Sequence, residues 1–212
     1  MILMLLSFIV SSLLLALSPG PDNLYLTVLT SRSGKIAGFS FLTGLLIGCL
    51  VHTTLLAFGL NELILKYDMI FKMLKYSGFF YLIYLSYDVY KSEILIESDG
   101  SGVNNSKIFK SLKKGILMNL LNPKVFLFFT LFFPNFIYSE TYSFKLQIMS
   151  LGIIFIITTF IIFGIIILFS DNIYKNFSSN SNFKIFAKYF NILVLLLIAI
   201  LILFTENNIT LT

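Results

Sequence analysis

The chain has 212 residues, of which 58% are hydrophobic and only 12% are charged, and its mean hydropathy is +0.93. Soluble domains carry about 25% charged residues, so a soluble globule, a disordered chain and a nucleic-acid-binding protein are excluded. One cysteine and one histidine cannot supply a disulfide framework, an iron–sulfur site or the usual zinc ligands within one chain. The composition therefore predicts an integral membrane protein.

Six apolar runs follow one another along the chain, each of about the 20 residues that a helix needs to cross a bilayer. They are continuously apolar rather than alternating, which favours helices over a β-barrel. The first run has no positively charged region ahead of its apolar core, so we expect a retained helix and not a cleaved signal peptide. The fold class predicted is all-α with six transmembrane helices, at residues 2–29, 37–60, 70–89, 116–137, 146–169 and 185–204.

The distribution of lysine and arginine predicts the orientation of these helices, because cytoplasmic loops are enriched in both. Ten of them fall in the loops after the first, third and fifth helices, four lie on the opposite side, and Lys124 is inside a run. We therefore expect both termini outside.

The longest polar connection divides the chain into halves. It predicts a first three-helix half at 1–95, a cytoplasmic linker at 96–114 and a second three-helix half at 115–212. Because three helices per half is an odd number, a structural repeat between the halves must be inverted, as in many secondary transporters. A 3+3 inverted repeat is therefore expected.

A polar motif interrupts the first apolar run. Two prolines remove backbone donors and obstruct the preceding turn, so the helix should break here. A broken backbone at membrane depth needs protein or a water-filled cavity around it. The alternative is a loop at the cytoplasmic interface. The motif, which we predict to bind or translocate a substrate, is Ser18-Pro19-Gly20-Pro21-Asp22-Asn23.

A second polar motif lies early in the fourth run. Asn119 and Asn122 share a helix face, whereas Lys124 would point away in an unbroken helix. Pro123 can bend the helix and turn this lysine inward, and the alternative is a lysine that snorkels to the cytoplasmic surface. We predict that these four residues belong to the same substrate site.

The direction of each helix places both motifs in the cytoplasmic half of the membrane at similar depth. One carboxylate, Asp22, and one ammonium, Lys124, would then converge with several amides on one cavity. Such a cavity suits a zwitterion such as an amino acid. His52 either relays a proton, since histidine titrates near neutral pH, or bonds to a neighbouring carbonyl. Gly44 and Gly48 are spaced to allow close helix packing.

Four stretches together resemble the LysE/RhtB family of bacterial amino-acid exporters, in the correct order and over nearly the whole chain. The resemblance implies a six-helix inner (plasma) membrane protein that exports an amino acid or a related small metabolite. It does not specify which. The stretches are SPGPDN at 18–23, GLLIGCLVH at 44–52, KYSGFFYLIYLSYDVYKS at 75–92 and GILMNLLNPKVFLFFTLFFPNF at 115–136.

The function predicted is secondary export, coupled to the proton motive force because the sequence contains no nucleotide-binding motif. It requires no enzyme activity, catalytic residue, metal or cofactor, and its partners are a small amino-acid-like substrate and the lipid bilayer, not nucleic acid. Two alternatives stay open: a metal-cation exporter of the same superfamily and a non-transporting scaffold. The sequence also leaves the oligomeric state open, a homo-oligomer included.

Overall fold

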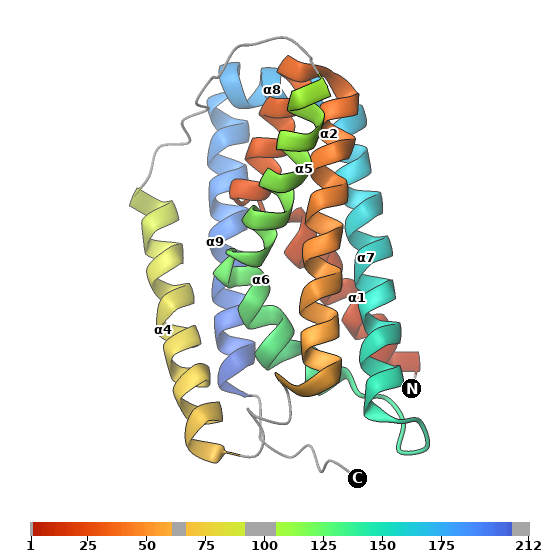
Figure 1. Cartoon of the computed structure of the whole chain (residues 1–212). Coiled ribbons are helices and arrows are strands. Elements are labelled where there is room, and N and C mark those ends of the chain that lie inside the picture. Colours follow the sequence, from red (N-terminus) through yellow and green to blue (C-terminus); the bar gives the residue numbers. More distant parts are fainter. Residues whose placement is uncertain (1, 61–66, 92–104, 205–212) are drawn as a thin grey trace.

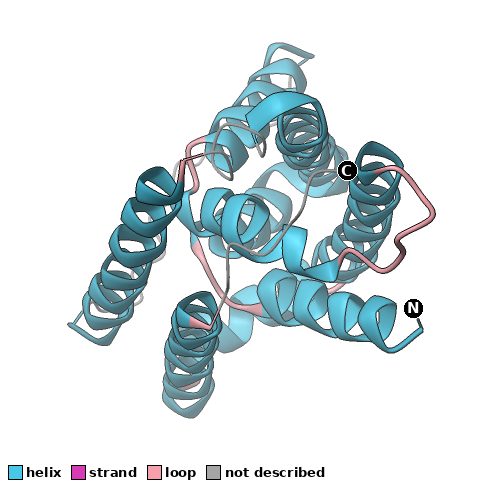
Figure 2. Cartoon of the chain, turned by 90° about the horizontal axis from the view of Figure 1, so that it is seen from below, coloured by secondary structure: helices cyan, strands magenta, loops and turns pink. Residues whose placement is uncertain are grey.

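The computed structural model describes residues 2–60, 67–91 and 105–204, and this part of the chain consists of helices and loops without a strand (Figures 1 and 2). The all-α prediction is confirmed. The elements are α1 (Ile2–Leu17), α2 (Pro21–Leu55), η1 (Leu56–Leu60), α4 (Asp68–Lys91), α5 (Asn105–Leu120), α6 (Pro123–Leu127), η2 (Phe128–Phe132), η3 (Phe133–Phe136), α7 (Phe144–Leu168), α8 (Ser170–Ser179) and α9 (Ser181–Leu203).

Several helices are long and apolar enough to cross a bilayer. Three qualify alone, namely Pro21–Gly59, Phe144–Leu168 and Ser181–Leu203. A fourth crossing is formed if the pair Ile108–Leu120 and Pro123–Phe136, bent by 49°, counts as one broken span. The chain is thus a multi-pass membrane protein, whereas the predicted total of six spans goes beyond what length and apolarity establish in the described residues.

α2 is not one straight rod, because the chain reverses direction at Gly34. This residue has φ +83°, a left-handed conformation that favours glycine. A Cβ on Gly38 would overlap the side chain of Thr30, eight residues earlier, although such residues lie about 12 Å apart along a continuous helix. α2 therefore contains the end of the first predicted run and most of the second predicted run. The reversal at Gly34 lies a few residues after the predicted end of the first run.

Two other features differ from the predicted runs. α5 begins at Asn105, so ten residues that the sequence assigns to the linker at 96–114 are helical. The short helix α8 was not predicted. Both segments mix charged and apolar residues, and an amphipathic helix leaves no continuous apolar run to detect. The remaining predicted linker, up to residue 104, lies outside the described residues.

α2 and α5 run parallel and their backbones touch. A Cβ on Gly44 would overlap the carbonyl oxygen of Leu112, and one on Gly115 would overlap that of Phe41. Further along the same contact, a Cβ on Gly48 would lie 2.5 Å from the Asn119 amide oxygen. The absence of side chains at these glycines is what allows the close approach, as predicted for Gly44 and Gly48.

Two of the other main contacts are antiparallel, and a third is parallel. α2 packs on α7 with Gly38 beside Ile167 at one end and Thr53 beside Gly152 at the other. α4 packs on α9 at the edge of the bundle (Figure 1), with Lys188 at the start of α9 over the ring of Tyr90 at the end of α4. α1 packs on α7.

An aromatic cluster fills the core around α6, η2 and η3. Phe8 meets Phe133 edge to face at 4.9 Å between ring centroids, and Phe129 stacks on Phe133 at 4.8 Å. Phe155 of α7 packs on Phe128 at 5.5 Å and on Phe129 at 5.1 Å. All five rings are buried. They pack a segment that changes from α-helix to π-helix to 3₁₀-helix within 14 residues.

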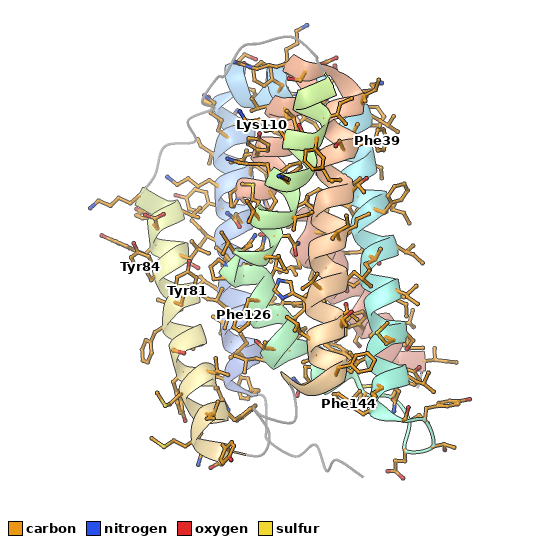
Figure 3. The ribbon with its side chains drawn as sticks, viewed as in Figure 1. Phe39, Tyr81, Tyr84, Lys110, Phe126 and Phe144 are labelled. Carbon is orange, nitrogen blue, oxygen red and sulfur yellow. The ribbon has the colours of Figure 1, made fainter. Side chains whose placement is uncertain are left out.

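The outer surface carries many large apolar side chains. Figure 3 shows Phe39 and Tyr84 projecting outward from α2 and α4, and they are 38% and 61% exposed. Ile153 of α7 and Leu193 of α9 are exposed as well. Apolar exposure on this scale is unfavourable in water and fits a surface that faces lipid.

The glycine contact between α2 and α5 generates a stability prediction. Gly44→Ala adds a methyl group against the Leu112 carbonyl, so we expect a loss of about 1–3 kcal/mol, as for overpacked cores. Gly164→Ala in α7 is the matched control, because a Cβ there meets nothing within 4 Å. Thermal unfolding in detergent measures both. An unchanged melting temperature for Gly44→Ala would contradict the close packing.

Candidate functional site

The first helix break lies where the sequence predicts it. α1 ends at Leu17 and α2 begins at Pro21, which occupies the first helical position, where its missing N–H costs nothing. Ser18 is fully buried and Asp22 is 7% exposed. Ser18, Gly20 and Asp22 are therefore buried in the bundle, whereas Pro21 is exposed.

The carbonyls at the end of α1 are satisfied by side chains from elsewhere. Asn23 Nδ2 donates to the carbonyl of Ala16 at 2.8 Å. Lys124 Nζ, on α6, donates to the carbonyls of Leu15 at 3.4 Å and Ser18 at 3.3 Å. The ammonium also lies at the negative end of the α1 dipole, where a positive charge is favourable.

The second break separates α5 from α6. Asn122 has an extended backbone, and its Oδ1 accepts a hydrogen bond from the Lys124 N–H at 3.0 Å. Asn122 is thus the N-cap of α6, and Pro123 follows it at the first helical position. Lys124 is only 7% exposed, so it turns inward and does not snorkel.

One hydrogen bond connects the two breaks directly. Asn122 Nδ2 donates to Asp22 Oδ2 at 2.7 Å, across 100 residues of sequence. Asp22 also lies in the first turn of α2, where the helix dipole favours a carboxylate. Asp22 and Lys124 do not form an ion pair with each other. The amide of Asn122 binds the Asp22 carboxylate, and the carbonyls of α1 bind the Lys124 ammonium.

A small cavity of about 30 Å³ lies between the breaks. Its wall includes four of the predicted polar residues, and Pro19, Gly20, Pro21 and Pro123 shape the backbone around it. The cavity has room for one or two water molecules. The four polar wall residues are Asp22, Asn23, Asn119 and Lys124.

Several residues near the cavity were not predicted. Asn191 of α9 accepts a hydrogen bond from Ser18 Oγ at 2.7 Å. Cys49 lies in the cavity wall and accepts from Asn119 Nδ2 at 3.4 Å. Thr159 of α7 is also in the wall. Asn191 could have been noticed as a single amide within an apolar run, whereas nothing in the sequence distinguishes Thr159 from Thr158.

His52 lies outside the cavity wall. It is buried on α2, and its ring stacks on Phe129 at 5.3 Å between centroids. Its Nε2 has no hydrogen-bond partner. A role in proton relay therefore stays a prediction.

Comparisons with known proteins give one family and two relatives. A model of the LysE type translocator family matches residues 13–205. A homoserine/homoserine lactone efflux protein of Salmonella typhimurium is 29% identical over 131 residues, covering 62% of this chain and 63% of that protein. An uncharacterized membrane protein of Pseudomonas aeruginosa is 27% identical over 135 residues, covering 62% of each. The chain thus spans under two thirds of either relative's length. No solved structure matches the chain.

The double role of Asn122 generates a second stability prediction. Asn122→Ala removes a helix cap, worth about 1 kcal/mol, and leaves the buried Asp22 carboxylate without its hydrogen bond, worth about 1–3 kcal/mol more. Asn180→Ala removes only an exposed cap, the bond from Phe183 N–H at 3.1 Å. We expect the first variant to unfold at clearly lower temperature than the second. Equal losses would mean that the link to Asp22 contributes nothing.

Proposed function

The chain belongs to the LysE type translocator family, and from that premise we propose that it exports amino acids or related small metabolites across the bacterial inner membrane. The homoserine/homoserine lactone efflux protein among its relatives supports small amino metabolites as the cargo. The residues proposed to bind and translocate the substrate are Ser18 to Asn23 on the first break and Asn119, Asn122, Pro123 and Lys124 on the second.

The observation that carries this proposal is the meeting of two interrupted helices around one small cavity whose wall holds a carboxylate and an ammonium. Interrupted helices in the membrane interior are typical of secondary transporters, where half-helix ends surround the substrate. Here the cavity wall holds one carboxylate and one ammonium that are not paired with each other. A scaffold that transports nothing would not need two buried charges, and each of them lowers stability in a bilayer.

We propose six crossings arranged as a 3+3 inverted repeat. They are α1 with the first part of α2, the second part of α2, α4, α5 with α6 to η3, α7, and α9. In such a repeat α1 corresponds to α5, α2 to α7 and α4 to α9. The α2–α5 contact then corresponds to the α7–α1 contact, and the α2–α7 and α4–α9 contacts correspond to themselves. The parallel α2–α5 contact and the antiparallel α2–α7 contact also agree with helices that alternate in direction.

The arrangement of basic residues supports the proposed orientation. The turn at Gly34, the start of α5 and the helix α8 lie at one end of the bundle (Figure 1), and Lys110 lies near that end (Figure 3). With this end in the cytoplasm, the halves 1–95 and 115–212 are joined by a cytoplasmic connection and both termini are outside.

We propose that the proton motive force drives export. Buried acids in transporters carry protons between the two sides of the membrane, and Asp22 is a buried acid at the junction of the two breaks. His52 is the proposed relay, because its Nε2 is buried without a partner.

The export proposal predicts that both buried charges are essential. We expect Asp22→Asn and Lys124→Met each to abolish export of a neutral amino acid from cells fed with labelled dipeptides, while the protein still inserts in the membrane. Asp68→Asn is the control, because Asp68 forms an exposed ion pair with Lys72 at 2.6 Å, and exposed pairs contribute little. A protonophore should stop wild-type export.

Other results would contradict the export proposal or favour a competing function. Wild-type rates in both variants would contradict a shared substrate cavity. Export of a divalent cation but of no amino acid would favour the metal-cation exporter, and absence of all export would favour the scaffold. Export that continues with the protonophore would contradict proton coupling.

The orientation proposal has its own test. A reporter that is active only outside the cytoplasm, fused after Thr212, should be active, and a reporter that is active only in the cytoplasm should be silent there. The opposite result would invert the proposed topology while leaving the cavity unchanged.

A further inference from the structure

Three buried oxygen atoms of the cavity residues have no hydrogen-bond partner. They are Asp22 Oδ1, Asn119 Oδ1 and Thr159 Oγ1, and all three residues line the same cavity. Buried acceptors without partners lower stability, so a folded protein retains them where a ligand or water completes them. Each of the three atoms can accept a hydrogen bond, and none of them receives one.

Thr159 differs from three other threonines in the helices of this protein. Thr27, Thr53 and Thr130 each donate to the carbonyl four residues earlier, at 2.7–2.8 Å, which is the usual way for a helical threonine to satisfy its hydroxyl. Thr159 makes no such bond. Thr159 thus lines the cavity with a hydroxyl that has no partner in the described part of the protein. Thr30 of α2 also has an unpartnered hydroxyl, but it lies outside the cavity wall.

The same wall also holds a positively charged hydrogen-bond donor. Lys124 has three N–H donors, of which two reach the carbonyls of Leu15 and Ser18. The third has no partner, and Lys124 lines the cavity together with Asp22. The cavity therefore offers unpartnered acceptors and one unpartnered, positively charged donor.

The rest of the wall is mainly apolar and adds no further charge. It includes Leu45, Val125, Phe155 and Phe163. A ligand charge beyond one ammonium and one carboxylate, such as a charged side chain, would be buried there without a partner, which is strongly unfavourable.

We propose that Thr159, with the free oxygen of Asp22 and the amide oxygen of Asn119, forms the subsite that binds the substrate's ammonium group, and that the cavity selects zwitterions with an uncharged side chain. An ammonium group has three donors for the three acceptors, and the substrate's carboxylate pairs with Lys124. The inference rests on the proposed export function, which it narrows to neutral amino acids and their close relatives. Because the present cavity is the size of a water molecule, binding requires it to widen.

The chain supplies its own reporter for binding. Cys49 is its only cysteine, lines the cavity and is 1% exposed. Its alkylation by N-ethylmaleimide in proteoliposomes therefore follows opening of the cavity, and a bound substrate should slow it. Cys49→Ser, which should remain unlabelled, shows that no other group reacts.

The test compares Thr159→Val with Thr158→Val, its neighbour in α7, which is buried but outside the cavity wall. We expect Thr159→Val to raise the leucine concentration for half-protection of Cys49 about tenfold or more, because a bond to a charged group is lost. Thr159→Ser, which keeps the hydroxyl, should stay close to the wild type. Thr158→Val should leave protection unchanged.

A panel of ligands tests the selectivity. Leucine and homoserine should protect Cys49, whereas lysine and glutamate should protect at least about tenfold less well. The 2-hydroxy acid analogue of leucine, which has no ammonium group, should bind weakly and equally to the wild type and Thr159→Val.

Three results would overturn the inference: equal effects of Thr159→Val and Thr158→Val, protection by lysine as good as by leucine, or no protection by any zwitterion. Failure of the export proposal is distinguishable from these. If the wild type exports no compound of the panel and yet Cys49 protection depends on Thr159, the subsite stands and the transport function does not.

Discussion

The structure depends on one constraint: a helix that is interrupted inside a membrane must find partners for every backbone group that the interruption frees. Water is scarce there, and each unsatisfied group costs several kcal/mol. At the first break the freed carbonyls receive the Asn23 amide and the Lys124 ammonium. At the second, the Asn122 side chain receives the first N–H of α6. The polar side chains that meet at the cavity are thus the same ones that make the two interruptions tolerable.

Hydrogen bonds at the two breaks connect the two halves of the chain. Lys124, from the second half, satisfies carbonyls of the first half, and Asn122 holds Asp22 of the first half through its amide nitrogen. The second break is capped within its own half by Asn122, whereas the first break depends on Lys124 from the other half. This connection fits a repeat whose halves move relative to each other around a common site, since a change at one break alters the bonds of the other.

The sequence predicted the features that arise from local chemistry. Proline interrupts a helix wherever it occurs, so both breaks could be located from the motifs, and helix direction placed them at similar depth. Features set by tertiary packing could not be predicted. Thr159 is identical in type and surroundings to Thr158 until the neighbours of α7 are known. The turn at Gly34 lies in the polar stretch 30–36 between the first two predicted runs. The helix α8 was missed because its few apolar residues form no continuous apolar run.

The aromatic cluster beside the cavity has a consequence for leakage. Phe155 lines the cavity and packs on Phe128 and Phe129, which connect to Phe133 and Phe8. The protein interior on this side is thus filled by packed aromatic rings and not by charged groups. Such a barrier holds by dispersion and exclusion of water, so neither salt nor acid weakens it. Its backbone of short π and 3₁₀ turns is inherently less regular than an α-helix. Small ions therefore meet hydrocarbon on this side of the cavity, and the barrier that it presents does not depend on the charges of Asp22 and Lys124.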